Sequence, residues 1–177
     1  KKVKSTNNIA IRLIKNSKNK FGMIVADKQN NGRGRQGKKW ISYNGNLFVS
    51  IFFSLEKINF SLKQITKINC FLVKKLLSIY YKKKITVKAP NDLLINKKKI
   101  CGILQEIIKQ SDKTYMIVGI GVNLIKSPNI KNYPTTNLFE VTNKKFNKKY
   151  IVLRLKNIYE NFIEQGLKFN FKNVKNI

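Results

Sequence analysis

The stretch QNNGRGRQGKKW, residues 29–40, gathers the rarest residue types of this 177-residue chain. The chain has 33 Lys but four Arg, and Arg33 and Arg35 both lie here, together with three of its nine Gly and its single Trp, Trp40. A guanidinium offers planar, bidentate hydrogen bonding that an ammonium lacks. Because the alternating glycines let the backbone approach a ligand closely, the stretch is typical of an anion-binding loop. The alternative is a solvated surface loop.

The same stretch matches the dinucleotide-binding pattern G-x-G-x-x-G at residues 32–37. That pattern binds a pyrophosphate only when a strand precedes it and a helix follows it. Residues 22–26 are suited to a strand, but residues 41–46 predict a turn and residues 47–53 a second strand. Because no helix follows, the sequence argues against a doubly wound dinucleotide-binding fold. A second candidate that begins at Gly119 lacks its third glycine and fails as well.

Hydrophobic spacing predicts the remaining elements. A first helix is expected after Ser5 or Thr6, with Ile9, Leu13 and Ile14 on its buried face. A second helix is expected after Ser61 with Leu62 on its buried side, and a third over residues 150–165. Strands are expected at residues 22–28, 47–55, 85–88, 93–95, 100–108 and 115–122, and residues 123–147 are expected to be mostly loop. The prediction is one α+β domain over residues 1–177, a mixed β-sheet with helices packed on one face.

Composition excludes several classes of protein. The chain has no histidine, which removes Ser-His-Asp, Cys-His and His-zinc chemistry. Cys70 and Cys101 lie far apart and predict neither a disulfide framework nor a zinc site, so a reducing cytoplasm is the expected location. The longest apolar run, residues 47–55, is shorter than the roughly 20 residues that span a bilayer, and the N-terminus lacks a signal-peptide pattern. No membrane association is expected.

The formal net charge of +29 raises the question of nucleic-acid binding. Lys, Asn and Ile together supply 80 of the 177 residues, and all three are encoded by A/T-rich codons. The lysines are also spread from end to end. Drift in base composition is therefore favoured over a selected basic surface, and a basic nucleic-acid-binding protein stays as an alternative.

Two further motifs carry polar groups between predicted strands. In KAPND, residues 88–92, the proline fixes a bend and Asn91 and Asp92 place polar groups at it. A carboxylate near phosphates usually indicates bound Mg²⁺, whereas the alternative is an ordinary turn. Lys99 opens a predicted strand directly after a turn, so its side chain is held on rigid backbone. The alternative there is a solvated lysine.

Taken in order, these motifs resemble the successive signatures of biotin protein ligases. The resemblance covers residues 3–124 and fits the C-terminal helix more loosely. It rests on Ser5-Thr6-Asn7 with Ala10, the loop 32–37 followed by Trp40, Pro90-Asn91-Asp92, Lys99 with residues 102–104 and Glu106, and the run 119–123. It implies the fold shared with lipoate ligases and class II synthetases.

The resemblance also implies a two-step reaction. Biotin and ATP, with Mg²⁺, give biotinyl-5′-AMP and pyrophosphate, and the acyl group then passes to a lysine of a biotin carboxyl carrier domain, as in acetyl-CoA carboxylase. A carboxylate must attack a phosphate, so positive donors have to neutralise both anions. A homodimer is compatible with the resemblance, and specific nucleic-acid binding is not expected.

Each motif residue receives a role by its position in the resemblance. Lys99 and Arg35 are the expected catalytic residues, with Lys99 bridging the biotin carboxylate and the α-phosphate. Arg33 and Arg35 are expected to bind the carboxylate and then the acyl phosphate. The other expected biotin-binding residues are Ser5, Thr6, Asn7, Gln29, Gly34 and Gly102. The expected ATP-binding residues are Trp40, Asn91, Asp92, Lys99 and Asn123, with Asp92 also proposed to bind Mg²⁺.

The chain departs from the family pattern at Ala89, where the family usually has Trp, and at Lys38, where Arg is common. We expect no helix-turn-helix before Lys1, so the resemblance does not imply repressor activity. The small C-terminal β-barrel of many members is also expected to be absent. The rival assignment is a lipoyl or octanoyl transferase, which shares the fold but lacks the Gly-Arg-Gly-Arg-Gln-Gly loop.

Overall fold

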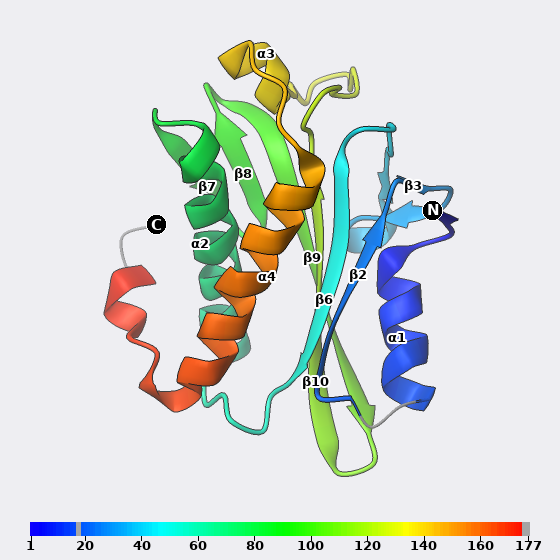
Figure 1. Ribbon diagram of the computed structural model, residues 1–177, viewed down its shortest axis with the longest axis vertical. Coiled ribbons are helices and arrows are strands. Elements are labelled where there is room, and N and C mark those ends of the chain that lie inside the picture. The colour runs from blue at the N-terminus through cyan, green and yellow to red at the C-terminus, as the bar shows by residue number, and fades with distance from the viewer. Residues whose placement is uncertain (17–18, 175–177) are drawn as a thin grey trace.

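A six-stranded antiparallel sheet forms the centre of the computed structural model, which describes residues 1–16 and 19–174 (Figure 1). The strand order is β2-β6-β10-β9-β8-β7, and every neighbouring pair in it is antiparallel. The strands are β2 (Phe21–Ala26), β6 (Leu47–Ser54), β7 (Ile85–Lys88), β8 (Asp92–Ile95), β9 (Lys98–Gln110) and β10 (Lys113–Val122). The strands predicted from sequence are confirmed, with bounds that shift by a few residues.

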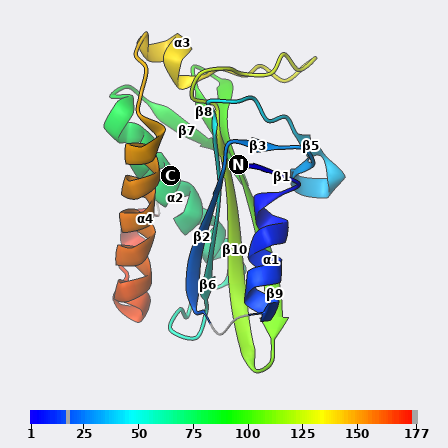
Figure 2. The ribbon, with the colours of Figure 1, turned by 45° about the vertical axis from the view of Figure 1, so that its right-hand side comes forward.

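Three long helices pack on the sheet: α1 (Thr6–Asn16), α2 (Leu62–Tyr80) and α4 (Lys148–Gln165). Figure 2 shows α2 and α4 on one face and α1 on the other. The predicted α+β class is confirmed, whereas the expectation that all helices share one face is wrong. The large sheet is antiparallel throughout, whereas a sheet with mixed parallel and antiparallel pairing was expected. The parallel pair among the described strands joins β1 (Lys2–Val3) to β3 (Lys28–Gln29), outside the large sheet.

The central strand β6 explains how helices cover both faces. All eight of its residues are buried. Ile51 and Phe53 pack in the core beneath α2 and α4, whereas Phe52 packs in a smaller cluster with Ala10 and Ile14 of α1. A strand covered on both faces reads as a continuous apolar run, and so its sequence shows burial without showing which helix covers which face.

Local signals fix the ends of the helices. Ser61 caps α2 by accepting a hydrogen bond from the Gln64 amide, and the Gln64 side chain accepts one from the Ser61 amide in return. Two predicted burials are wrong: Leu13 of α1 is 38% exposed and Leu62 of α2 is 57% exposed. On α1 the buried positions include Thr6 and Asn7.

The glycine-rich loop is a small hairpin. Strand β4 (Gly32–Arg33) pairs with β5 (Lys39–Trp40), and a single 3₁₀ turn, η1 (Arg35–Gly37), joins them. The next long element is strand β6, so the argument against a dinucleotide-binding fold is confirmed.

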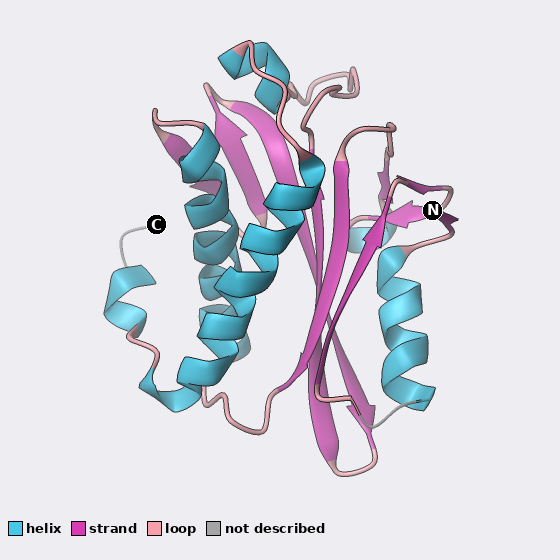
Figure 3. Cartoon of the chain, in the orientation of Figure 1, coloured by secondary structure: helices cyan, strands magenta, loops and turns pink. Residues whose placement is uncertain are grey.

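Residues 123–147 contain one helix that the sequence prediction missed, α3 (Leu138–Thr142) (Figure 3). Asn137 caps it by accepting a hydrogen bond from the Glu140 amide. Further along the chain, Gly166 follows α4 as predicted and begins the 3₁₀ turn η2 (Gly166–Lys168), which precedes η3 (Phe171–Val174).

Across the described ranges, no helix is both long and apolar enough to cross a bilayer. Cys70 and Cys101 are free and buried, as expected for a chain without a disulfide framework. Burial raises the pKa of the Cys70 thiol to about 12. It raises that of Cys101 well above its usual value. Because the reactive form of cysteine is the thiolate, neither thiol is suited to act as a nucleophile.

Candidate active site

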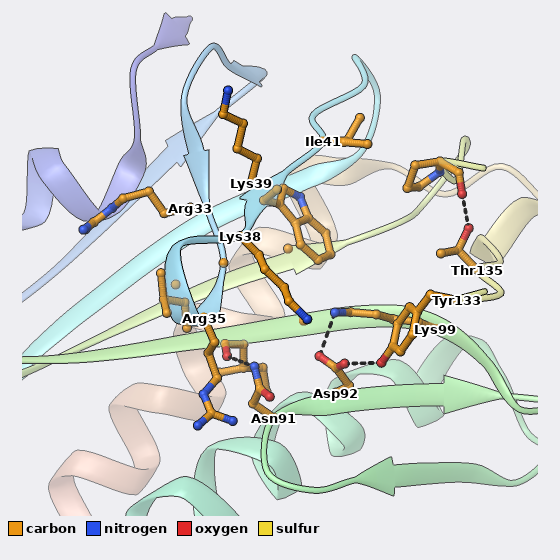
Figure 4. Close-up of a pocket in the computed structure, with 18 of the residues that line it drawn as sticks. Arg33, Arg35, Lys38, Lys39, Ile41, Asn91, Asp92, Lys99, Tyr133 and Thr135 are labelled. Atoms are coloured by element: carbon orange, nitrogen blue, oxygen red, sulfur yellow. Dashed lines mark hydrogen bonds and ion pairs between the residues drawn. The ribbon is translucent and has the colours of Figure 1, made fainter. Parts of the chain in front are cut away.

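A cavity of about 620 Å³ opens between the β4–β5 hairpin, the turn that joins β7 to β8, and the segment after β10 (Figure 4). Every site residue expected from sequence lines this cavity: Ser5, Thr6, Asn7, Gln29, Arg33, Gly34, Arg35, Trp40, Asn91, Asp92, Lys99, Gly102 and Asn123. Seven basic side chains line it, and among the described residues Asp92 is its only carboxylate. Such an excess of positive charge in a concave site favours an anionic ligand.

A polar network lies where α1 begins. The amide and the hydroxyl of Thr6 both donate hydrogen bonds to Gln29 Oε1, at 2.8 and 3.0 Å. The Ser50 hydroxyl lies 2.7 Å from Thr6 Oγ1 and 2.5 Å from Asn7 Oδ1. A side chain at Gly119 would place its Cβ 2.4 Å from Asn7 Oδ1, so glycine is required for this close approach. The network presents fixed polar groups at one end of the cavity.

The two arginines of the glycine-rich loop differ in their partners. Arg33 Nη2 donates to Glu106 Oε2 at 2.6 Å, and Asn7 Nδ2 donates to the same oxygen at 2.6 Å. Arg35 is exposed on η1 and has no carboxylate partner among the described residues. Figure 4 shows the two side chains pointing away from each other, with Arg35 beside Asn91. The structure therefore gives Arg33 an internal partner and leaves the Arg35 guanidinium available to an anion.

Lys99, near the start of β9, lines the cavity. Its Nζ forms an ion pair of 2.8 Å with Asp92 Oδ1, and both side chains are largely buried. The other carboxylate oxygen, Oδ2, accepts a hydrogen bond of 2.5 Å from the Tyr133 hydroxyl. Burial, followed by the hydrogen bond to Asp92, raises the pKa of Tyr133, so the phenol stays protonated at neutral pH.

Trp40 stacks against the two glycines that face each other across β9 and β10, Gly102 and Gly121. A Cβ at Gly121 would lie 2.5 Å from the indole ring, and one at Gly102 would lie 2.7 Å from it. The Lys99 ammonium lies 5.4 Å from the ring centroid. Indole Nε1 is buried and donates to no described residue. The ring thus forms a flat wall of the cavity, and its buried N–H is not used by any described residue.

Asn91 and Asn123 form side-chain hydrogen bonds to backbone carbonyls around the cavity. Asn91 Nδ2 donates to the Ile103 carbonyl at 2.7 Å, and Asn123 Nδ2 donates to the Thr136 carbonyl at 3.1 Å. Both residues were expected to contact ATP. In the described part of the chain the amide oxygen of Asn123 is buried without a hydrogen-bond donor. Both side chains therefore hold neighbouring backbone in place, and the amide oxygen of Asn123 has no hydrogen-bond partner among the described residues.

The residues fit Mg²⁺ only as an ion held mainly by a ligand's phosphates. Among the described residues, no group of three or more carboxylate or thiol side chains is arranged to hold a metal. Asp92 is the single cavity carboxylate, and its two oxygens contact Lys99 and Tyr133. Mg²⁺ commonly binds through one or two carboxylates together with substrate phosphates and water. Asp92 can supply one ligand of that kind.

Three residues that contribute to the cavity or its support were given no role from sequence. Glu106 holds Arg33 and Asn7, Tyr133 holds Asp92, and the Lys88 ammonium lies 4.6 Å from the centroid of the Tyr133 ring. Glu106 is one of eight acidic residues, and this rarity was an available signal. Tyr133 lay in a stretch expected to be loop and gave no comparable signal.

Comparisons with known proteins agree with this geometry. Residues 1–123 match the model of the biotin/lipoate A/B protein ligase family. A bifunctional ligase/repressor BirA of Bacillus subtilis is 34% identical over 127 residues, covering 71% of this chain and 39% of that protein. A biotin–[acetyl-CoA-carboxylase] ligase of Paracoccus denitrificans is 29% identical over 108 residues, covering 59% of this chain and 45% of that protein.

Solved structures give the same result. A biotin protein ligase from Aquifex aeolicus, in complex with biotin and ATP, superposes with a TM-score of 0.80 at 33% identity, covering 99% of this chain and 73% of that one. The matches span less than half the length of the two curated relatives named above. The family match covers well over half of this chain, and the chain therefore belongs to the biotin/lipoate A/B protein ligase family.

Proposed function

We propose that this protein activates biotin with ATP and transfers it to a lysine of a carrier domain. In the first step a biotin carboxylate oxygen attacks the α-phosphorus, forming an oxygen–phosphorus bond and releasing pyrophosphate. In the second step the amine of a carrier lysine attacks the acyl carbon, which forms the amide and releases AMP, and the amine loses a proton. The Aquifex aeolicus relative, which was solved with biotin and ATP, supports this choice of substrates.

The observation that carries the proposal is the placement of Lys99. Two anions must approach each other in the first step, so a preorganised positive donor at the point of contact lowers the barrier. Lys99 is largely buried, sits on β9 and is oriented by Asp92. Arg35 adds a guanidinium suited to both carboxylate and phosphate oxygens. Catalysis by positioning and charge is consistent with a chain that has no histidine.

The two ends of the cavity suit the two substrates. The Thr6–Gln29 network offers fixed donors and acceptors for the polar head group of biotin. Trp40 offers a flat face for the adenine ring, and Asn123 lines the same cavity. In this assignment Arg33 acts through Glu106 and Asn7 rather than by direct contact with the carboxylate. Mg²⁺, when bound, would neutralise phosphate charge, with Asp92 as its protein ligand.

The acceptor we propose is a biotin carboxyl carrier domain of the acetyl-CoA carboxylase type. The name of the Paracoccus denitrificans relative supports this partner. A cytoplasmic location fits the free, buried cysteines. We further propose that residues 1–177 act as one catalytic unit without sequence-specific DNA binding, and a homodimer stays a prediction.

Biotin-dependent exchange of radiolabelled pyrophosphate into ATP tests the first step. We expect exchange with biotin and none with lipoate, whereas exchange with lipoate alone would assign the chain to the lipoyl or octanoyl branch of the family. A thermal-shift series with biotin, lipoate, ATP and single-stranded DNA gives an independent readout, because a ligand that binds only the folded state raises its stability. Labelling of a purified carrier domain then tests the transfer step.

A further inference from the structure

The segment that follows β10 holds Lys99 by its main chain. The Lys99 amide donates to the Pro134 carbonyl at 2.8 Å, and the Thr136 amide donates to the Lys99 carbonyl at 2.9 Å. These bonds form a short parallel bridge between Lys99 and Thr135. Residues 134–136 therefore fix the backbone from which the Lys99 side chain extends.

Tyr133, the neighbouring residue of the same segment, reaches the Lys99 side chain through Asp92. Its hydroxyl donates to Asp92 Oδ2 at 2.5 Å, while Asp92 Oδ1 pairs with Lys99 Nζ at 2.8 Å (Figure 4). Its ring centroid lies 5.4 Å from the Lys99 ammonium and 4.6 Å from that of Lys88. Cations are attracted to the face of an aromatic ring at such distances. One tyrosine thus contacts both the carboxylate and the ammonium of the pair.

We propose that Tyr133 is a positioning residue for the adenylation step, in which its hydroxyl fixes Asp92 and so aims the Lys99 ammonium into the cavity. The inference rests on the proposed function. An ammonium has three N–H donors. Asp92 holds this ammonium through an ion pair, and the N–H donors that point into the cavity can meet the biotin carboxylate and the α-phosphate. Without the phenol, the Asp92 carboxylate can turn about its broad terminal torsion, and Lys99 turns with it.

Tyr133→Phe isolates the hydroxyl because it keeps the ring near both lysines. We expect single-turnover formation of biotinyl-AMP to fall about 10- to 100-fold, the scale of a hydrogen bond to a charged group. The KM for biotin should stay within about twofold, because the lost contact orients a group used in the transition state. Tyr43→Phe is the matched control: the Tyr43 ring lies 5.0 Å from the Lys126 ammonium, and this tyrosine does not line the cavity.

A double-mutant cycle distinguishes action through Asp92 from direct contact with the nucleotide. In an Asp92→Asn background, Tyr133→Phe should lower the rate by no more than about twofold further, because the two changes remove one shared interaction. Equal losses in both backgrounds would overturn the proposal, since Tyr133 would then act independently of Asp92. A raised KM for ATP with an unchanged rate of chemistry would also overturn it.

A second readout needs no turnover. Reductive methylation with carbon-13 labels the lysines, and the signal that disappears in Lys99→Arg identifies Lys99. We expect Tyr133→Phe to shift that signal and Tyr43→Phe to leave it in place. An unmoved Lys99 signal would refute the contact. If the wild-type protein shows no biotin-dependent exchange, the proposed function fails, while the lysine signal still decides whether Tyr133 positions Lys99.

Discussion

Arg33 and Asn7 donate hydrogen bonds to the same oxygen of Glu106, each at 2.6 Å. One carboxylate oxygen therefore joins the glycine-rich loop, the start of α1 and β9. It also pairs with the charge of Arg33, so the two arginines of the loop have different partners despite their equivalent places in the sequence. Both arginines line the cavity, but Arg33 already has a carboxylate partner, whereas the Arg35 guanidinium has none among the described residues.

Glu106→Gln should weaken biotin binding. The neutral amide oxygen accepts hydrogen bonds more weakly than a carboxylate, and the amide NH₂ is itself a donor that cannot bond to the N–H groups of Arg33 and Asn7. We expect the KM for biotin to rise about 10-fold, near the lower end for hydrogen bonds to a charged group, since the site is partly exposed. Glu160→Gln is the control, because Glu160 forms an exposed pair with Lys156 on α4. Similar KM values for the two variants would contradict the role given to Glu106.

Lys99→Ala should lower biotinyl-AMP formation by roughly 10²- to 10³-fold, the scale for removing one preorganised charge donor. Lys98→Ala, one residue earlier, should change the rate little. Lys98 pairs loosely with Glu140 at 3.7 Å and does not line the cavity. Single-turnover measurement with saturating biotin and ATP separates the two, and equal effects would remove Lys99 from its assigned role.

The strands and helices were largely predictable because their signals are local. The apolar run of β6 and the Ser61–Gln64 cap both lie within a few residues of sequence. The set of α1 side chains that face the sheet was not predictable from an apolar pattern. Its buried positions include Thr6 and Asn7 because they line a polar cavity, so a search for an apolar stripe chose Leu13, which the structure leaves 38% exposed.

The grouping of the thirteen expected site residues was also predictable, because all of them line one cavity, while their roles stay predictions. The hydrogen-bond partners of these residues were not predictable from the sequence. Glu106 meets Arg33 across 73 positions and Asn7 across 99, and Tyr133 meets Asp92 across 41. Such pairs depend on the pairing of β9 with its neighbours and on the path of the segment after β10. The chemistry of guanidinium in a glycine-rich loop and the resemblance both suggested that both loop arginines bind a ligand.

Arg35→Gly should let biotinyl-AMP escape from the cavity, because the guanidinium can hold carbonyl and phosphate oxygens together. Free adenylate acylates exposed lysines, so bystander proteins in the assay should become biotinylated. Gln36→Gly is the matched control for loop flexibility: Gln36 has a φ of 54°, a conformation that glycine adopts without strain. Labelling confined to the carrier domain in both variants would show that Arg35 does not retain the intermediate.

The net charge of +29 should affect the transfer step more than the adenylation step. The seven basic side chains of the cavity act on small substrates at short range, where salt screens weakly. An acidic carrier domain instead approaches from a distance, so the field raises its rate of association without adding much affinity.

We therefore expect added salt to slow carrier labelling while biotinyl-AMP formation changes little, measured on the same preparation with bovine albumin as a non-specific acceptor. DNA binding should be independent of sequence and should weaken steeply with salt, because it arises from the release of counterions. Sequence-selective binding that survives about 0.2 M salt would contradict base drift as the full account of the charge, since purely electrostatic binding falls greatly in that range. Equal salt dependence of the two steps would show that the surface lysines do not steer the carrier.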